Sequence, residues 1–490
     1  IEERRVDQND LNFGANVKWN ASKAFTLTGG INYKWNRTEY YKKMDDLLGG
    51  DYYLNIDQFA ERDFASSPTM VQNDLDYFLE HGEAKALKEG DKYGYDYYAH
   101  VRNANVWANG ALDLGGFKAN LALEAGYAKF WREGLVRKGL FAGLDDNGNE
   151  MMYEGKVLTT YDEKTGKALT SKGNSEIADF LTYSAKLGLQ YHFEGGHRIY
   201  ANGAYFNDAP TFAQSFISPR TRNSLVPNLT TVKTASADLN YQYSNNGYNF
   251  RITGFWTNIA DQTDMMSFYD DSQNSFTNFA MSGIDKLHFG LEAAVQVPIY
   301  RGLSLRGALS WGQYTYTSNP DYVQTRDNSA EVISEGKVYW EDFRVESTPQ
   351  LAASIGLNFR SNNNWFLSAD CNYYDHMYLS MSPIYRTDEV ISSSMTDADI
   401  AYMRRQERFD DAFVLNASIG KNWSIKYKYT LGFSLNVDNL LNNQDIKTGG
   451  YEQTRLAKNE ETTVTSYQPF DSKYFYMFGT TYYLNIYFRF

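Results

Sequence analysis

The sequence has 490 residues, 42% of them hydrophobic and 16% aromatic, and a formal net charge of −13. No basic run or patch is present that could replace the counterions of nucleic-acid phosphates, which argues against a nucleic-acid partner. No segment of about 18 consecutive apolar residues occurs, so a conventional transmembrane helix is excluded.

Alternation of apolar and polar residues with a period of two is the dominant pattern along the chain. It is clearest in residues 183–193, 287–297, 303–311, 351–359 and 431–438. Successive side chains of a β-strand point to opposite faces, so these segments are predicted strands with one apolar and one polar face. The polar face suits water, and the apolar face suits either lipid or a second sheet.

Short turn signals alternate with long irregular segments along the sequence. The predicted turns lie at residues 20–23, 115–116, 195–196, 245–247, 300–302, 361–364 and 421–425. The long segments lie at residues 37–92, 134–178, 209–230, 261–282, 318–344, 380–407 and 442–473. Outer-membrane barrels combine short periplasmic turns with long extracellular loops, whereas long irregular loops are unusual in compact soluble domains. The pattern favours an all-β fold, an antiparallel transmembrane β-barrel.

The number of predicted strands is odd. Seven turns join 14 strands, and residues 474–490 add one more, which gives about 15. A single-chain bacterial barrel normally has an even number of strands with both ends in the periplasm. We therefore expect residues 1–490 to be a C-terminal portion of a barrel whose first strands lie outside this chain.

One long segment contains a helix signal. Ser67 followed by Pro68 resembles a helix start, with Ser67 as the capping residue, and apolar residues then follow at helical spacing until Gly82. The sequence predicts a short loop helix there.

The motifs for catalysis and metal binding are weak or absent. Residues 145–150 resemble the start of a calcium loop, but Lys156 occupies the place where the closing glutamate would stand, so a plain turn is favoured. His192 and His197 flank a predicted turn without a third ligand. No nucleophile elbow, phosphate loop, dinucleotide fingerprint or zinc helix occurs. We expect no enzymatic activity, no cofactor and no metal site.

Three segments resemble TonB-dependent outer-membrane receptors. Residues 226–259 resemble a hairpin of that family, although Val226 stands where an asparagine is typical. Residues 435–443, with the sequence Leu-Asn-Val-Asp-Asn-Leu-Leu-Asn-Asn, resemble the penultimate strand. The chain ends in a strand whose apolar face resembles the signal read by the outer-membrane assembly machinery; this face includes Tyr482, Leu484, Ile486, Phe488 and Phe490.

The resemblance implies a barrel of about 22 strands in the cell outer membrane, of which this chain would supply about 15. It also implies an N-terminal plug domain and a TonB box, neither of which is in residues 1–490. The expected partners are outer-membrane lipid, the TonB complex (through the missing N-terminal part), the plug with the first strands, and a small nutrient ligand. A surface lipoprotein partner is left open.

The expected function is TonB-dependent active import of a nutrient across the outer membrane. A passive porin and a secreted all-β ligand-binding module or adhesin are the alternatives. The ligand stays open among glycan, siderophore, haem, vitamin and peptide, and no substrate-binding residue is assigned. Charges that the alternation places on the inner face are Lys186, Arg251, Glu292, Arg306, Asp370, Asp438 and Arg489.

Overall fold

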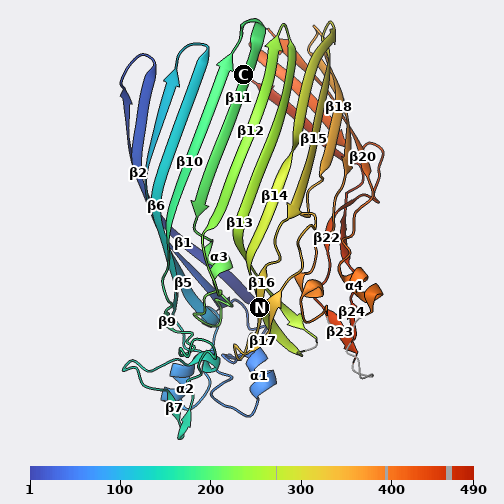
Figure 1. Cartoon of the computed structure of the whole chain (residues 1–490). Helices are drawn as coiled ribbons and strands as arrows, with labels where there is room; N and C mark the ends of the chain where they lie inside the picture. The colour runs from blue at the N-terminus through green and yellow to red at the C-terminus, as the bar shows by residue number, and fades with distance from the viewer. Residues whose placement is uncertain (272, 392–395, 427, 460–465) are drawn as a thin grey trace.

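The computed structural model describes residues 1–271, 273–391, 396–426, 428–459 and 466–490. One antiparallel sheet of 18 strands dominates it (Figure 1). Fifteen of these strands follow one another as a meander, each hydrogen-bonded to the next, which confirms the predicted fold class and the number of about 15. The 15 strands are β1 (Glu2–Asn20), β2 (Phe25–Met44), β5 (Lys92–Asp113), β6 (Phe117–Gly134), β10 (Ala178–His192), β11 (His197–Asp208), β12 (Val232–Asn245), β13 (Tyr248–Asp270), β14 (Ser275–Tyr300), β15 (Leu303–Tyr316), β18 (Leu351–Arg360), β19 (Trp365–Asp375), β20 (Ala412–Ile425), β21 (Tyr429–Asp438) and β26 (Thr481–Arg489).

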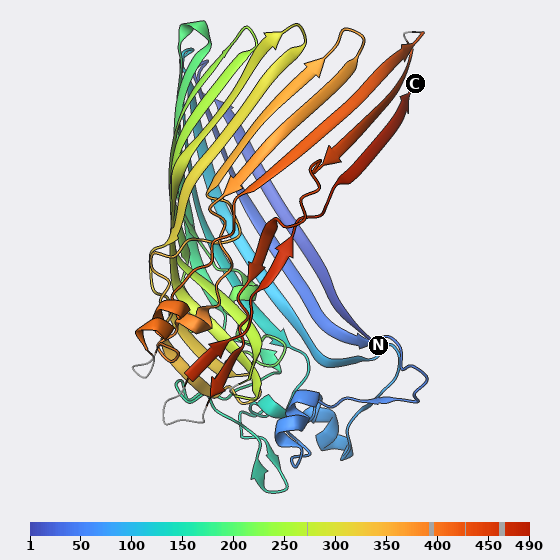
Figure 2. The same cartoon turned by 90° about the vertical axis from the view of Figure 1, so that its right-hand side faces the viewer.

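The sheet curves strongly but does not close on itself (Figure 2). Strand β1 pairs with β2, and β26 pairs with β21. Among the described residues no pairing joins β1 to β26. The outer edges of these two strands therefore present backbone N–H and C=O groups without a strand partner.

Short turns gather at one rim of the sheet and long loops at the other (Figure 1). The turn between β12 and β13 consists of Asn246 and Gly247, both with positive φ, which is the backbone that a tight two-residue hairpin requires. Six of the seven predicted turns lie between strands as expected. The seventh was wrong, because residues 421–425 continue strand β20 and the turn follows Ile425.

The segment 261–282 was predicted as a long loop, and this prediction was also wrong. Strands β13 and β14 continue through it to Asp270 and Ser275. The pairing shifts register on either side of Gln262, and Asp261 has a positive φ of 62°. A bulge of this kind interrupts the period-two alternation, so the sequence pattern looked irregular where the strand continues.

The remaining long loops carry short helices and strands. Their helices are α1 (Gln58–Phe64), α2 (Leu75–His81), η1 (Gly139–Phe141), α3 (Phe212–Ser215), η3 (Pro383–Arg386) and α4 (Asp397–Met403), while η2 (Glu194–Gly196) forms a turn at the other rim. None of the helices in the described residues is long and apolar enough to cross a membrane. Of the loop strands, β9 (Gly173–Asn174), β16 (Asp321–Arg326) and β17 (Val332–Lys337) extend the main sheet. Four small sheets pair the others, which are β3 (Tyr53–Leu54), β4 (Ala86–Leu87), β7 (Met152–Tyr153), β8 (Lys156–Val157), β22 (Lys447–Tyr451), β23 (Leu456–Asn459), β24 (Ser466–Pro469) and β25 (Lys473–Tyr476).

The predicted loop helix exists but begins later than the sequence suggested. Helix α2 starts at Leu75, capped by the Asp74 carboxylate, which accepts a hydrogen bond from the Tyr77 N–H at 3.1 Å. Ser67 instead closes a local turn, in which its hydroxyl accepts from the Met70 N–H at 3.4 Å. The helix ends at Gly82 in the left-handed conformation, as predicted. Two of the predicted loops include residues 392–395 and 460–465, which lie outside the described residues.

The two faces of the sheet differ as the alternation predicted. Leu187, Leu291, Ile355 and Leu431 all point outward and are solvent-exposed in the isolated chain. The largest cluster of buried apolar side chains lies elsewhere, at the long-loop rim, and includes Phe268, Phe279, Met281, Tyr316, Tyr322, Val338, Trp340, Ile384 and Tyr385. The wall therefore exposes its apolar side, and the loops form the packed core.

Candidate functional site

Buried cations connect loops that are far apart in the sequence. Arg222 is almost fully buried and donates to the Asp327 carbonyl at 2.9 Å and to the Thr325 hydroxyl at 3.2 Å. Its guanidinium also lies over the Phe141 ring at 5.2 Å. Burial lowers the pKa of Arg222, and the nearby Asp327 opposes this effect. One side chain thus joins three loops.

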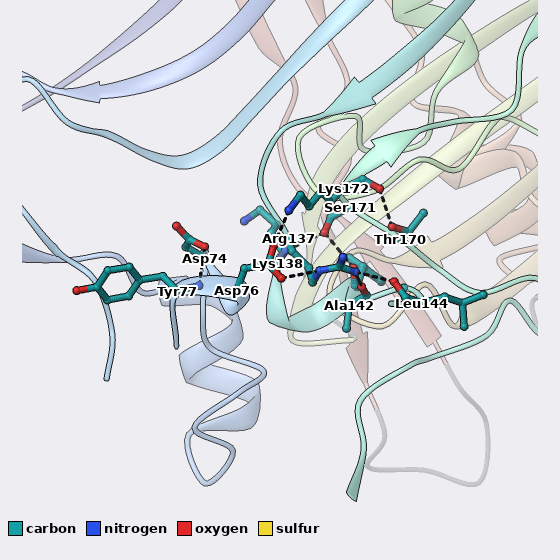
Figure 3. Close-up of polar contacts among 12 residues, drawn as sticks. Asp74, Asp76, Tyr77, Arg137, Lys138, Ala142, Leu144, Thr170, Ser171 and Lys172 are labelled. Carbon is teal, nitrogen blue, oxygen red and sulfur yellow. Dashed lines mark hydrogen bonds and ion pairs between the residues drawn. The ribbon is translucent and has the colours of Figure 1, made fainter. Parts of the chain in front are cut away.

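A second group of polar contacts joins the loops 45–91 and 135–177 (Figure 3). Arg137 donates to the Asp76 carboxylate at 2.8 Å and to the Leu144 carbonyl at 2.9 Å. Lys172 binds the other oxygen of Asp76 at 2.7 Å. Asp76 stands in helix α2, so these contacts fix that helix on the neighbouring loop.

Lys138 pairs with a carboxylate that is more deeply buried than that of Asp76. Its ammonium group lies 3.0 Å from the Asp57 carboxylate and 2.7 Å from the Asn73 side-chain oxygen. Asp57 is also the cap of helix α1, accepting from the N–H groups of Phe59 and Ala60. Burial alone would raise the pKa of Asp57, but Lys138 and the helix N–H groups outweigh it and the pKa is lowered.

Two further ion pairs connect the loop that follows β21 to other parts of the long-loop rim. Arg386 is buried and binds both oxygens of Glu452, at 2.6 and 3.0 Å. Arg455 binds both oxygens of Asp271, at 2.7 and 2.9 Å, at the tip of the β13–β14 hairpin. Two-oxygen contacts of arginine with a carboxylate fix orientation as well as distance. The long loops consequently form one connected layer, which we name the loop layer.

The inner face of the sheet carries charged residues that pair with each other. Arg251 lies 3.8 Å from Glu292, and Arg306 lies 3.3 Å from Asp370. Arg251, Arg306 and Asp370 line a hollow together with Gln242, Asn249, Gln296 and Ser354. Arg251 and Glu292 stand on neighbouring strands, whereas Arg306 reaches Asp370 across the intervening strand β18, where Gly356 has no side chain. This part of the wall therefore holds oppositely charged groups facing the interior.

Other residues singled out in the sequence are not brought together. Among the predicted inner charges, Lys186, Asp438 and Arg489 form no ion pair with any described residue. His197 contacts the Tyr241 hydroxyl and His192 contacts Gln190, so the two histidines have separate partners. The Asp145 carboxylate accepts from the N–H groups of Asn147 and Asn149, a turn contact. Within the described residues no group of three or more His, Cys, Asp or Glu side chains could hold a metal.

The terminal strand lies where the sequence placed it. Tyr482, Leu484, Ile486 and Phe488 belong to β26 and face, in register, apolar residues of β21 such as Leu435. Phe490 follows the strand and is 94% exposed. The apolar face is continuous across both strands, and the role of this strand in assembly remains a prediction.

Sequence reasoning missed the residues that build the loop layer. Arg137, Lys138, Arg222 and Arg386 lie in irregular segments, and none stands in a recognisable motif. Their partners are often backbone carbonyls or residues more than 60 positions away. No local pattern in the sequence could have identified them.

Residues 2–440 match the family model described as "TonB dependent receptor-like, beta-barrel". None of the curated proteins compared with the chain matches it.

Solved structures share the fold at low sequence identity. The structure entitled "Copper transporter OprC" has a TM-score of 0.55 at 11% identity, over 99% of this chain and 59% of that one. The FrpB iron transporter from Neisseria meningitidis has a TM-score of 0.52 at 12% identity, over 99% and 55%. The ferric yersiniabactin uptake receptor FyuA from Yersinia pestis has 0.50 at 11%, over 99% and 54%. The chain therefore spans a little over half the length of these structures.

The Asp57–Lys138 contact makes the loop layer sensitive to acid. Because the folded-state pKa of Asp57 is lowered, its contribution is full above the unfolded-state pKa and is lost as pH falls through the folded-state pKa. Asp57→Asn should lower the local opening free energy of helix α1 by about 3 kcal/mol at neutral pH, since Lys138 stays buried without its counter-charge. Hydrogen exchange of residues 57–64, corrected for intrinsic rates, measures this.

The matched control is Asp146→Asn, because Asp146 is exposed and has no hydrogen bond or ion pair with a described residue. It should exchange like the wild type at every pH. Equal protection of helix α1 in Asp57→Asn and wild type at neutral pH would show that the contact does not hold the loop layer.

Proposed function

Because this chain belongs to the TonB-dependent receptor family, we propose that it forms the wall of an active importer for a small nutrient ligand. The chain is an outer-membrane protein of that family, with its exposed apolar face toward lipid. The short turns then face the periplasm and the loop layer faces the outside. The family consists of transport receptors, and we propose no catalytic role for this chain.

The observation that carries the proposal is the combination of a charged inner face with a connected loop layer. Arg251, Glu292, Arg306 and Asp370 line the interior, where fixed charges are hydrated at little energetic cost. The loop layer stands at the outer rim of the same interior (Figure 2). A ligand arriving from outside would meet the loop layer first and the charged wall afterwards.

Active import in this family requires protein segments in addition to the described residues. We propose that a plug domain fills the interior, that its TonB box couples it to the TonB complex, and that further strands complete a barrel of about 22. The unpaired edges of β1 and β26 support the added strands, because an unsatisfied backbone group in lipid costs several kcal/mol. A surface lipoprotein above the loop layer is a further candidate partner.

Energy dependence distinguishes the importer from a passive porin. Cells producing the complete receptor should take up a radiolabelled ferric catecholate or cupric ion only while the proton gradient is intact, and a protonophore should reduce uptake to background. Uptake that continues at the same rate after protonophore would indicate a porin. Cells lacking the receptor give the background for each probe.

A secreted soluble module is the remaining alternative, and the exposed outer face argues against it. Leu181, Leu239 and Ile355 are each more than half exposed along three different strands. Contiguous apolar surface of this extent requires a cover. Within the described residues no second sheet covers it.

The missing strands can be tested by expressing residues 1–490 alone and together with the upstream part of the receptor. The separate chain should give no heat-modifiable band on a gel, because the edges of β1 and β26 cannot close on each other. Supplying the upstream part should restore the band. A heat-modifiable monomer from residues 1–490 alone would contradict the proposal that the barrel needs added strands.

We propose that the apolar face of the terminal strand, including Tyr482, Leu484, Ile486, Phe488 and Phe490, guides assembly into the outer membrane. Phe490→Ser in the complete receptor should reduce the amount of folded, heat-modifiable protein in outer membranes, because the exposed terminal ring is removed. Arg489→Gln is the matched control on the opposite face and should assemble normally. Equal amounts of folded protein in wild type and Phe490→Ser would refute the role.

A further inference from the structure

Trp107, on strand β5, is the one tryptophan on the inner face of the wall. All nine tryptophans of the chain lie in the described residues. Trp340 belongs to a loop, and the other seven point outward from the strands: Trp19, Trp35, Trp131, Trp256, Trp311, Trp365 and Trp423. Trp107 stands between Val106, which is exposed on the lipid side, and Ala108. Its indole therefore points to the interior.

The indole ring packs over a glycine of the neighbouring strand. Gly30 on β2 is paired in register with Trp107. A Cβ atom at Gly30 would stand 3.0 Å from two carbons of the indole, Cε2 and Cζ2, so a side chain there would displace the ring. Trp107 is only half-buried. The ring thus lies against the wall and keeps part of its surface open to the interior.

Polar side chains border the ring. Glu124 on β6 is directly paired with Trp107, on the side opposite to Gly30. The Asn105 amide donates to the Glu124 carboxylate at 2.9 Å, and the Asn32 amide donates to the Asn105 side-chain oxygen at 2.8 Å. The indole Nε1 lies 3.2 Å from the Asn32 amide. Hydrogen-bonding groups are therefore held beside the aromatic surface.

The Glu124 carboxylate keeps acceptor capacity for a ligand. A carboxylate has about four acceptor sites, and Asn105 uses one of them. Glu124 forms no ion pair with any residue that the structure describes. Its negative charge would repel an acidic ligand at short range. The site consequently favours an uncharged molecule that carries hydroxyl groups.

Trp107 stands near mid-height of the wall. Strand β5 ends at Asp113, six residues after Trp107, beside a short periplasmic turn. Six residues at about 3.3 Å each, on a strand tilted by about 40°, rise about 15 Å, which is close to the middle of an apolar belt of about 25 Å. A ligand that crosses the interior from the loop layer must pass this height.

We propose that Trp107, Glu124, Asn105 and Asn32 bind one ring of an uncharged oligosaccharide. A pyranose ring has an apolar face of C–H groups that packs on an aromatic ring, and a rim of hydroxyl groups that amides and carboxylates bind. The four side chains supply both kinds of surface from three adjacent strands. This inference names the substrate class of the proposed importer, and it rests on that function.

The test measures binding of hexasaccharides to the complete receptor, purified in a detergent without a sugar headgroup, by saturation-transfer difference NMR. The neutral probes are maltohexaose, cellohexaose and mannohexaose, and hexagalacturonate is the acidic comparison. At least one neutral probe should receive saturation from the receptor, and hexagalacturonate should receive none. Trp107→Ala should weaken binding about tenfold, since aromatic stacking contributes roughly that factor. Trp107→Phe should restore most of the affinity, because it keeps an aromatic surface.

Trp256→Ala is the matched control, because it removes an indole from the outer face of β13 at a similar distance from the periplasmic rim. It should leave oligosaccharide affinity unchanged. Glu124→Gln removes the negative charge at nearly constant size, so hexagalacturonate should begin to bind. A heat-modifiable band confirms that each variant is folded.

Two results would overturn the proposal: no saturation of any neutral probe, or unchanged affinity in Trp107→Ala. If a plug segment covers the ring instead, Trp107→Ala should lower the Tm of the complete receptor while the wild type binds no sugar, which also overturns it. Failure of the importer is seen separately, because oligosaccharide binding needs no proton gradient. Sugar binding at Trp107 together with uptake that continues after protonophore would refute active import and support this site.

Discussion

Every backbone N–H and C=O group at the depth of the hydrocarbon must find its hydrogen-bond partner within protein, because lipid offers none. The 15-strand meander meets this requirement between its strands by pairing each strand with the next in the chain, and leaves it open at the outer edges of β1 and β26. The same constraint explains where the strands and the loops lie in the molecule. Among the described residues, regular strands occupy the membrane depth and the connecting loops lie at the two rims, where water or the loop layer can satisfy their backbone groups.

The constraint also sets the charge distribution. Because neighbouring strands satisfy the backbone hydrogen bonds, alternate side chains can face lipid on one side of the wall and water on the other. Arg251 and Arg306 can therefore stand in the wall of a membrane protein, Arg251 beside a carboxylate on the next strand and Arg306 beside one two strands away.

The sequence predicted the strands of the wall well and the contacts within the loops poorly, for a physical reason. Strand faces and tight turns are local properties, so segments such as 183–193 and the Asn246–Gly247 turn were readable from adjacent residues. The bulge at Asp261 broke the pattern and concealed the continuation of β13. Contacts such as Arg386 with Glu452 join residues 66 positions apart, and only the fold brings them together.

The contacts of Arg222 with three loops bear on how antibodies and bacteriophages recognise the loop layer. Antibodies and bacteriophages recognise the shape of exposed loops, and here loops 135–177, 209–231 and 317–350 all contact a single buried side chain. One substitution beneath the surface could thus alter several epitopes together without changing any residue that an antibody touches. Variation under immune pressure need not map onto the exposed positions.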